Sequence, residues 1–237
     1  MYVQAFEAPF ERRQGASKVD LEQVRELIIP RDRIHTNKRA EIEGFPALIL
    51  ASVSPRRRQL LTEAGYKFAV VKPEVDESAF PTDGVNVCEY ARQLALAKAN
   101  SVASAYPNSL VIGADTVVGF QGRIIGKAAD AEDARYITEK LFSAPHKVIT
   151  AVAIVRHGDG TEVVESDTTT VYPRKMTARQ IAEHIAGGSW QDKAGAYAIQ
   201  ETGDRFVEKI EGSLTNVMGL PIELLESLLT RLGISHR

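Results

Sequence analysis

Cysteine is nearly missing from this chain: Cys88 is the only one among its 237 residues. A single cysteine cannot form an internal disulfide, so we expect a protein of a reducing compartment, the cytoplasm. No run approaches the roughly 18 consecutive apolar residues that a membrane-spanning helix requires. The first residues include Glu7, Glu11, Arg12 and Arg13. They contain no apolar core of a signal peptide, so neither export nor membrane association is predicted.

A strong excess of charge is also lacking. The chain has 29 Lys and Arg residues against 31 Asp and Glu residues, which gives a net charge of −2. General nucleic-acid binders show a marked basic excess, so nucleic acid is not an expected partner. The sequence has no Walker A loop and no G-x-G-x-x-G, H-E-x-x-H or G-x-S-x-G motif, and its five histidines lack metal-ligand spacing. Local clusters of charged side chains remain as a source of chemistry.

Beyond residue 44, short apolar runs alternate with stretches of helical periodicity. Strands interleaved with helices predict an α/β protein, with a mixed sheet and flanking helices that can form two lobes around a central cleft. Residues 1–44 form a polar, charged extension of unknown role, and residues 45–237 are expected to form one domain. Strands are expected over residues 47–50, 68–72, 110–115, 148–155 and 168–172, a hairpin over 116–125, and helices beginning at Ser54, Asn86, Asp130, Thr177 and Ile222.

The segment Ala51–Arg57 carries the clearest local signal. It follows a short apolar strand, and Ser54 with Pro55 is typical of a helix N-cap and first helical position. Arg56 and Arg57 then lie in the first turn, where the helix dipole favours anions. A phosphate would satisfy both the free N–H groups and the guanidinium forks, so this turn predicts an anion site. The alternative is a solvated first turn without a ligand.

Carboxylates form a second signal. Asp115 is expected at the end of an apolar strand, where the ligand crevices of open α/β sheets lie. There it could hold a hard cation or accept a proton from water; alternatively, it caps the following turn. Glu74, Asp76, Glu77 and Asp83 form an acidic stretch. This stretch is either a solvated loop or the source of a second carboxylate for a magnesium site.

Two lysines complete the set of candidates. Lys98 lies on the apolar stripe of its helix, and Lys127 lies between a hairpin and the next helix. Each is either an ordinary surface or turn lysine or a cation aimed into a cleft. Four basic side chains and at least two carboxylates in one cleft would suit a triphosphate with its magnesium. The cations would neutralise phosphate oxygens, the metal would polarise the phosphoryl centre, and a carboxylate would activate water.

Four segments of the chain share one resemblance. They are Leu50–Arg57 followed by Leu60, Leu61 and Gly65; Gly113–Val118 with Ile125–Lys127; Asp192–Gln200; and Ile210–Pro221. In this order they resemble the motifs of the Maf nucleoside triphosphate pyrophosphatases, and the resemblance covers about residues 47–230. Lys127 departs from the family pattern in being followed by Ala128, where proline is usual.

The resemblance implies hydrolysis of a nucleoside triphosphate to the monophosphate and pyrophosphate. Water would attack the α-phosphorus with help from a divalent cation, Mg²⁺ or Mn²⁺. By position, Asp115 matches the family's catalytic acceptor and is also expected to bind the metal. Glu77 matches the second residue on the metal side. The residues that would bind the phosphates are Ser52, Arg56, Lys98 and Lys127. Those that would select the nucleobase are Arg57, Thr116 and Gln200. The resemblance also implies a mixed sheet split by a cleft, and a homodimer.

Gly195–Gln200 resembles the subgroup that acts on dTTP and UTP. A glutamine amide offers both a donor and an acceptor, which suits the edge of uracil or thymine. One alternative is a relative that acts on 7-methyl-GTP or another purine nucleotide. Another is a non-catalytic nucleotide-binding regulator of cell division, because the family is also associated with septum formation. In each case the expected partner is a small nucleoside triphosphate.

Overall fold

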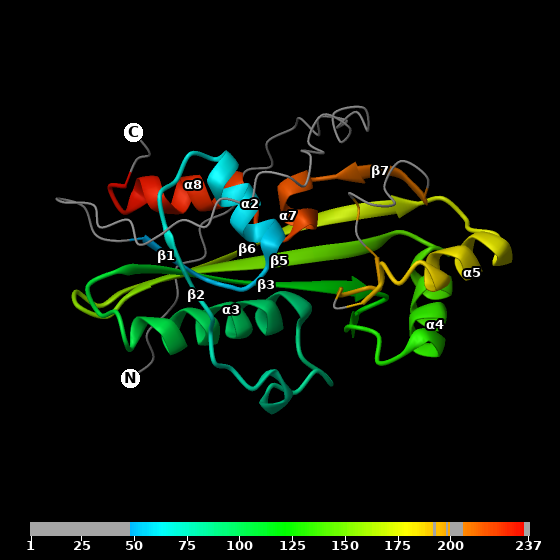
Figure 1. The fold of residues 1–237 in the computed structure, drawn as a ribbon, viewed down its shortest axis with the longest axis horizontal. Coiled ribbons are helices and arrows are strands. Elements are labelled where there is room, and N and C mark those ends of the chain that lie inside the picture. Colours follow the sequence, from blue (N-terminus) through cyan, green and yellow to red (C-terminus); the bar gives the residue numbers. More distant parts are fainter. Residues whose placement is uncertain (1–47, 192, 198, 200–205, 235–237) are drawn as a thin grey trace, which may run out of the picture.

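The computed structural model describes residues 48–191, 193–197, 199 and 206–234. A seven-stranded sheet runs through them in the order β2-β1-β3-β5-β6-β7, with β4 paired to β3 (Figure 1). Strand β1 is parallel to β2 and β3, and the other pairs are antiparallel, which confirms the expected mixed sheet. The strands are β1 Leu48–Ala51, β2 Ala69–Val71, β3 Leu110–Phe120, β4 Arg123–Ile125, β5 His146–Arg156, β6 Thr161–Pro173 and β7 Val207–Glu211.

Helices cover both faces of the sheet (Figure 1). Helix α3 packs on one face, and α2, α7 and α8 lie on the other. Helices α4 and α5 lie together where β3 ends and β5 begins. In the part of the chain that is described, no helix has the length and apolar character needed to cross a membrane. The helices are α2 Pro55–Glu63, the 3₁₀-helix η1 Glu77–Ala79, α3 Val87–Ala103, α4 Ala131–Leu141, α5 Ala178–Ala186, α7 Leu214–Met218 and α8 Ile222–Arg231.

Local capping chemistry begins the predicted helices where the sequence indicates. Ser54 precedes α2 and its side chain accepts from the Arg57 N–H, with Pro55 in the first helical position. Asn86 accepts from two N–H groups at the start of α3. Asp130 does the same for α4, and Thr177 forms a capping box with α5. Because each cap satisfies N–H groups that the helix leaves free, these starts are readable from short-range sequence alone.

The structure corrects the placement of Asp115. We expected Asp115 at the end of a strand, but it lies in the middle of β3, which continues to Phe120. The strand continues because β5 pairs with it from Val111 to Gly119. On its other edge, β1 pairs with β3 only as far as Gly113, and β4 pairs with it only from Val118. Among the described strands, the stretch between these two pairings has a neighbour only on the β5 side, so the edge of the sheet is open at Asp115.

Other elements differ from the sequence expectation in length or were not predicted. Strand β6 begins at Thr161, seven residues before the predicted start at Thr168. Its first half carries charged and polar side chains that hide the strand pattern, yet β5 pairs with all of it up to Val171. Strand β7, the short helix α7 and the 3₁₀-helix η1 were not predicted. Their apolar runs are too short to show the periodicity of a helix or the alternation of a strand.

Gly113 sets how closely α3 approaches the sheet. A Cβ at this position would lie 2.2 Å from the Ala95 carbonyl oxygen and 2.7 Å from the Ala99 nitrogen, so the helix backbone packs directly on β3. Further along the strand, Gly119 faces Val87 at the other end of the helix, with a Cβ distance of 3.4 Å. Helix α3 therefore runs antiparallel to β3, and the close approach at Gly113 brings Lys98 beside Asp115.

Candidate active site

A cavity of about 890 Å³ opens at the uncovered edge of β3. Its walls come from the β1–α2 turn, the segment after β2, helix α3, the end of β4 and the end of α7, which confirms the expected cleft. Gln191, Lys193, Ala194, Tyr197 and Ile199 complete the lining. The lining includes six cationic side chains and two carboxylates, although the whole chain has a net charge of −2. Positive charge is thus concentrated in this cavity. The charged residues are Arg56, Arg57, Lys72, Lys98, Lys127, Lys193, Glu77 and Asp115.

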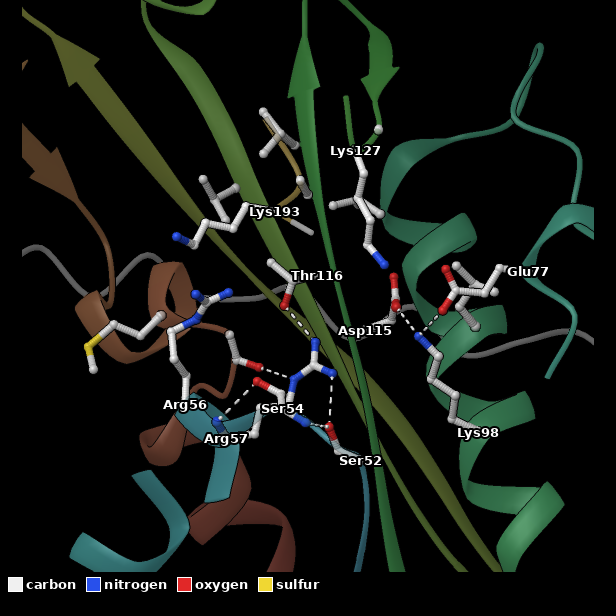
Figure 2. A pocket seen from close by; sticks show the side chains of 18 of the residues that line it. Ser52, Ser54, Arg56, Arg57, Glu77, Lys98, Asp115, Thr116, Lys127 and Lys193 are labelled. Carbon is white, nitrogen blue, oxygen red and sulfur yellow. Dashed lines mark hydrogen bonds and ion pairs between the residues drawn. The ribbon is translucent and has the colours of Figure 1, made fainter. Parts of the chain in front are cut away.

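One lysine joins the two carboxylates (Figure 2). Lys98 Nζ lies 2.6 Å from Asp115 Oδ1 and 2.7 Å from Glu77 Oε1. Lys98 and Asp115 are largely buried, whereas Glu77 is about half exposed. The sequence left open whether Lys98 is a surface side chain, and the structure shows it inside the cleft. Each carboxylate uses one oxygen on Lys98, so the second oxygen of each is left for another partner.

The two carboxylates have pKa values displaced in opposite directions. Burial raises the pKa of Asp115, although the charges of Lys98 and Arg57 oppose that rise. Burial also acts to raise the pKa of Glu77, but the bond to Lys98 and the charges of Lys98, Lys127 and Arg57 outweigh it, so the pKa is lowered. Glu77 therefore remains a fixed anion. Asp115 is the better proton acceptor because a raised pKa gives a stronger base.

Arg57 is held by three neighbours that converge on its guanidinium group (Figure 2). Its Nε donates to the Gly219 carbonyl oxygen at 2.7 Å, Nη2 to Thr116 Oγ1 at 3.0 Å and Nη1 to Ser52 Oγ at 3.4 Å. Burial lowers the pKa of Arg57, and the negative charge of Asp115 acts against that shift. These three hydrogen bonds fix the guanidinium group in one position, and its remaining N–H groups are available to a ligand.

Arg56 and Lys127 differ from Arg57 in how they are placed. Arg56, beside Arg57 in the first turn of α2, also lines the cavity, so this turn does not simply face solvent. Lys127 is positioned through the backbone, because it forms a β-bridge with Ala194 and the Gly195 N–H donates to the Gly126 carbonyl oxygen at 3.1 Å. The two segments that resemble family motifs around Lys127 and Gly195 are thus hydrogen-bonded to each other.

Strand alternation places Asp115 and Thr116 on opposite faces of β3. Asp115 shares its face with Val117, which belongs to the core under α3. Thr116 shares its face with Ala114, which belongs to the core under α2 and α7. Successive side chains of a strand point to opposite faces. The cavity therefore wraps around one open edge, with the lysine and carboxylates on one side and Arg57 on the other.

Eight of the nine candidate residues named from sequence line this one cavity, and the ninth, Gln200, lies outside the described residues. Sequence reasoning missed Lys72 and Lys193, which also line the cavity. Lys72 directly follows β2, as Ser52 follows β1, at the edge where parallel strands end. This arrangement could have pointed to Lys72. Lys193, whose Nζ donates to the Ser189 carbonyl oxygen, lies inside a segment quoted for its resemblance.

The two carboxylates of the cavity suit a hard divalent cation whose remaining ligands come from phosphate and water. Among the described residues, no three His, Cys, Asp or Glu side chains form a cluster that could hold a metal. Mg²⁺, however, is commonly bound through one or two carboxylates, substrate phosphates and water. Asp115 and Glu77 meet that requirement, because Lys98 holds them together and each keeps one oxygen that Lys98 does not use.

Fold and site together define an α/β protein with a cleft in which six cationic side chains surround two carboxylates, a charge distribution that suits an anionic ligand. Comparison with known proteins identifies it further. The family model described as "Maf-like protein" matches residues 47–232, and the chain belongs to this family. The match includes the charged cavity residues in all the segments described above.

Curated relatives cover most of the chain. A dTTP/UTP pyrophosphatase of Bdellovibrio bacteriovorus is 44% identical over 191 residues, which cover 78% of this chain and 98% of that protein. A dTTP/UTP pyrophosphatase of Citrifermentans bemidjiense is 42% identical over 183 residues, 77% of this chain and 94% of that protein. A solved structure, the nucleoside-triphosphatase / dITP/XTP pyrophosphatase of Mycobacterium abscessus, is 18% identical, with a TM-score of 0.38, over 78% of this chain and 94% of that one.

Proposed function

We propose that this protein hydrolyses dTTP and UTP to the nucleoside monophosphate and pyrophosphate. The observation that carries the proposal is the buried Asp115 carboxylate, held by Lys98 at the centre of a strongly cationic cavity. The relatives named dTTP/UTP pyrophosphatase, more than 40% identical over most of the chain, support the choice of reaction and base. They give no support to the 7-methyl-GTP alternative or to a non-catalytic regulator.

The reaction needs a proton acceptor next to the α-phosphorus. Asp115 takes a proton as the water oxygen bonds to that phosphorus, and the bond from the α-phosphorus to its bridging oxygen breaks with release of pyrophosphate. The raised pKa of Asp115 suits this role. Lys98 fixes the carboxylate, and Arg56, Lys98, Lys127 and Ser52 offset the negative charge of the phosphate oxygens.

A divalent cation, Mg²⁺ or Mn²⁺, fits the second oxygens of Asp115 and Glu77. When bound there with the triphosphate, it would supply Lewis-acid polarisation of the phosphoryl group. Glu77 suits the site because its lowered pKa keeps it ionised.

The base is assigned to the opposite face of β3. Arg57 and Thr116 present fixed polar groups there, and Val217 and Met218 add apolar surface to the cavity wall. Gln200 remains part of this proposal as an amide that could pair with the pyrimidine edge. The open edge between the two faces allows one nucleotide to reach both groups of residues.

We place the protein in the cytoplasm as a homodimer, on the basis of its single cysteine and the family resemblance.

The test is pyrophosphate release measured with Mg²⁺ or Mn²⁺ across dTTP, UTP, CTP, GTP and 7-methyl-GTP, with identification of the nucleotide product. We expect monophosphate and pyrophosphate from dTTP and UTP above all others. Asp115→Asn should lower kcat by about 10²- to 10⁴-fold while nucleotide binding survives. Asp167→Asn is the matched control, because Asp167 is also a partly buried carboxylate with a raised pKa but does not line the cavity. Release of orthophosphate, or full activity of Asp115→Asn, would refute the proposal.

A further inference from the structure

A buried asparagine behind the cavity ties a short helix to two strands. Asn216 of α7 is fully buried. Its Oδ1 accepts from the Thr150 N–H at 3.0 Å, and its Nδ2 donates to the Val148 carbonyl oxygen and to Thr169 Oγ1, both at 2.9 Å. The amide thus uses its acceptor and both donors on the neighbouring strands β5 and β6. Since every one of these groups is paired, the side chain has one orientation.

A line of hydroxyl groups connects this asparagine to Arg57. Thr150 Oγ1 donates to the backbone carbonyl oxygen of Asn216 at 2.8 Å. Thr150 therefore accepts at its other contact, and the Thr116 hydroxyl, 2.9 Å away, must donate to it. Thr116 Oγ1 in turn accepts from Arg57 Nη2 at 3.0 Å. Each hydroxyl has one donor role and one acceptor role, so the proton positions along the whole line are determined.

A second connection runs through the same short helix. Gly219 ends α7, and its carbonyl oxygen accepts from Arg57 Nε at 2.7 Å. Asn216 fixes α7 against the sheet one turn earlier, so it also determines where the Gly219 carbonyl lies. Two of the three groups that hold the Arg57 guanidinium therefore depend on one buried residue that does not line the cavity.

We propose that Asn216 and Thr150 are positioning residues that set the orientation of Thr116 and Arg57 and, through them, the choice of base. The inference rests on the proposed function, which assigns Arg57 and Thr116 to the base. Direct contact with the nucleotide is not required of either positioning residue. Their effect is to leave Thr116 a hydrogen-bond acceptor toward Arg57 and to keep the guanidinium plane fixed, so that its remaining N–H groups have one direction.

Thr150→Val is the clearest variant, because valine keeps the shape of threonine and removes only the hydroxyl. It removes the hydroxyl bonds to Thr116 and to the backbone carbonyl of Asn216, while the Thr150 N–H still donates to Asn216 Oδ1. Thr150→Ser keeps the hydroxyl and should restore the wild-type behaviour. Thr169→Val is the matched control, because Thr169 is an equally buried threonine whose hydroxyl contacts Asn216 Nδ2 and the Ser213 carbonyl oxygen. Its loss leaves the other two side-chain bonds of Asn216 and the whole hydroxyl line from Thr150 to Arg57 in place.

The measurement is the ratio of kcat/KM for UTP to kcat/KM for CTP, with thermal unfolding recorded for each variant. Loss of one net hydrogen bond corresponds to about fivefold, so Thr150→Val should lower the ratio about fivefold, mainly through a higher KM for UTP. Thr150→Ser and Thr169→Val should keep the wild-type ratio, although Thr169→Val should unfold at a lower temperature. An unchanged ratio in Thr150→Val, or an equal change in Thr169→Val, would overturn the inference.

A second readout separates this inference from the proposed function. The Arg57 Nε–H group gives its own ¹H–¹⁵N signal, and its exchange with solvent reports how firmly the guanidinium is held. We expect a protected signal in the wild type and in Thr169→Val, and faster exchange in Thr150→Val. If the wild type released no pyrophosphate, the proposed function would fail alone, and this signal would still decide whether Thr150 positions Arg57.

Discussion

Lys98 Nζ lies 2.6 Å from Asp115 Oδ1, so a side chain of α3 holds the carboxylate at the open edge of β3. The same ammonium group binds Glu77 at 2.7 Å, which ties the segment after β2 to the helix. Three separate parts of the chain thus meet at one cation. Lys98 acts on Asp115 both by position and by charge, since its charge opposes the rise in pKa that burial causes.

Removal of that charge should shift the pH dependence of turnover. In Lys98→Met, burial still raises the pKa of Asp115, but the main opposing charge is gone, so this pKa should rise further. Because the base acts when ionised, the acid limb of the profile of kcat/KM against pH should move to higher pH. A profile at fixed metal concentration measures this shift. An acid limb that stays in place, or moves to lower pH, would contradict the role given to Lys98.

Gly113→Ala should disturb both stability and catalysis. The added Cβ would meet helix backbone at 2.2 Å and 2.7 Å, so α3 must move away from β3. We expect a loss of about 1–3 kcal/mol in the free energy of unfolding, measured with urea, and a fall in kcat as Lys98 moves with the helix. Gly119→Ala is the control on the same strand, because its nearest neighbours would be side-chain methyl groups of Val87 and Ile149 at 3.4 Å or more. Equal effects of the two substitutions would argue against the close approach.

His146 should make stability depend on pH. It is buried, with Nδ1 3.2 Å from the Leu141 carbonyl oxygen and Nε2 2.7 Å from the Tyr197 hydroxyl, and burial lowers its pKa from 6.5 to about 4. Between these values the unfolded chain binds more protons, so stability is full above pH 6.5 and falls as pH drops toward 4. The loss is on the order of 3 kcal/mol. Urea unfolding across this range should show the slope in the wild type and a reduced slope in His146→Gln.

The β3–β4 turn offers a stabilising substitution away from the cavity. Gln121 and Gly122 connect the strands with φ values of 48° and 77°, as a type I′ turn requires, and Phe120 pairs with Arg123. Asparagine tolerates this left-handed region better than glutamine. Gln121→Asn should therefore raise the free energy of unfolding by about 0.5 kcal/mol. Gln121→Val, which is β-branched, should lower it in the same urea assay.

Residues whose role depends on near neighbours in sequence were predicted well. Ser54, Asn86 and Thr177 were expected to begin helices, and each one does, because a cap bonds to N–H groups two or three residues ahead. The mixed sheet also followed from the alternation of strand and helix patterns. Arg56, Arg57 and Asp115 were found because cations at a helix start and a carboxylate after an apolar run are unusual placements. The family resemblance, not a local pattern, chose Glu77, Lys98 and Lys127 among otherwise ordinary charged residues.

What the sequence did not reveal depends on contacts between distant segments. Asp115 interrupts an apolar run, so the strand seemed to end there by pattern, whereas β5 carries it onward and Lys98 balances the charge. Asn216 bonds to Thr169 and Val148, which lie 47 and 68 positions away in the chain. No local sequence pattern predicts these bonds. Lys72 was missed because its place beside Ser52 appears only once β1 and β2 are paired.

The ladder between β3 and β5, which runs without a break past Asp115 and Thr116, has a consequence for motion. Opening the backbone at these two residues means separating a nine-residue ladder, so their amide hydrogens should exchange with solvent only in rare, near-global openings. The segment between β2 and α3 pairs with no strand, its only regular element is the single turn of η1, and most of it is exposed. We therefore expect local opening of the cavity in the wall between β2 and α3, while the strand that bears Asp115, the proposed base, keeps its position.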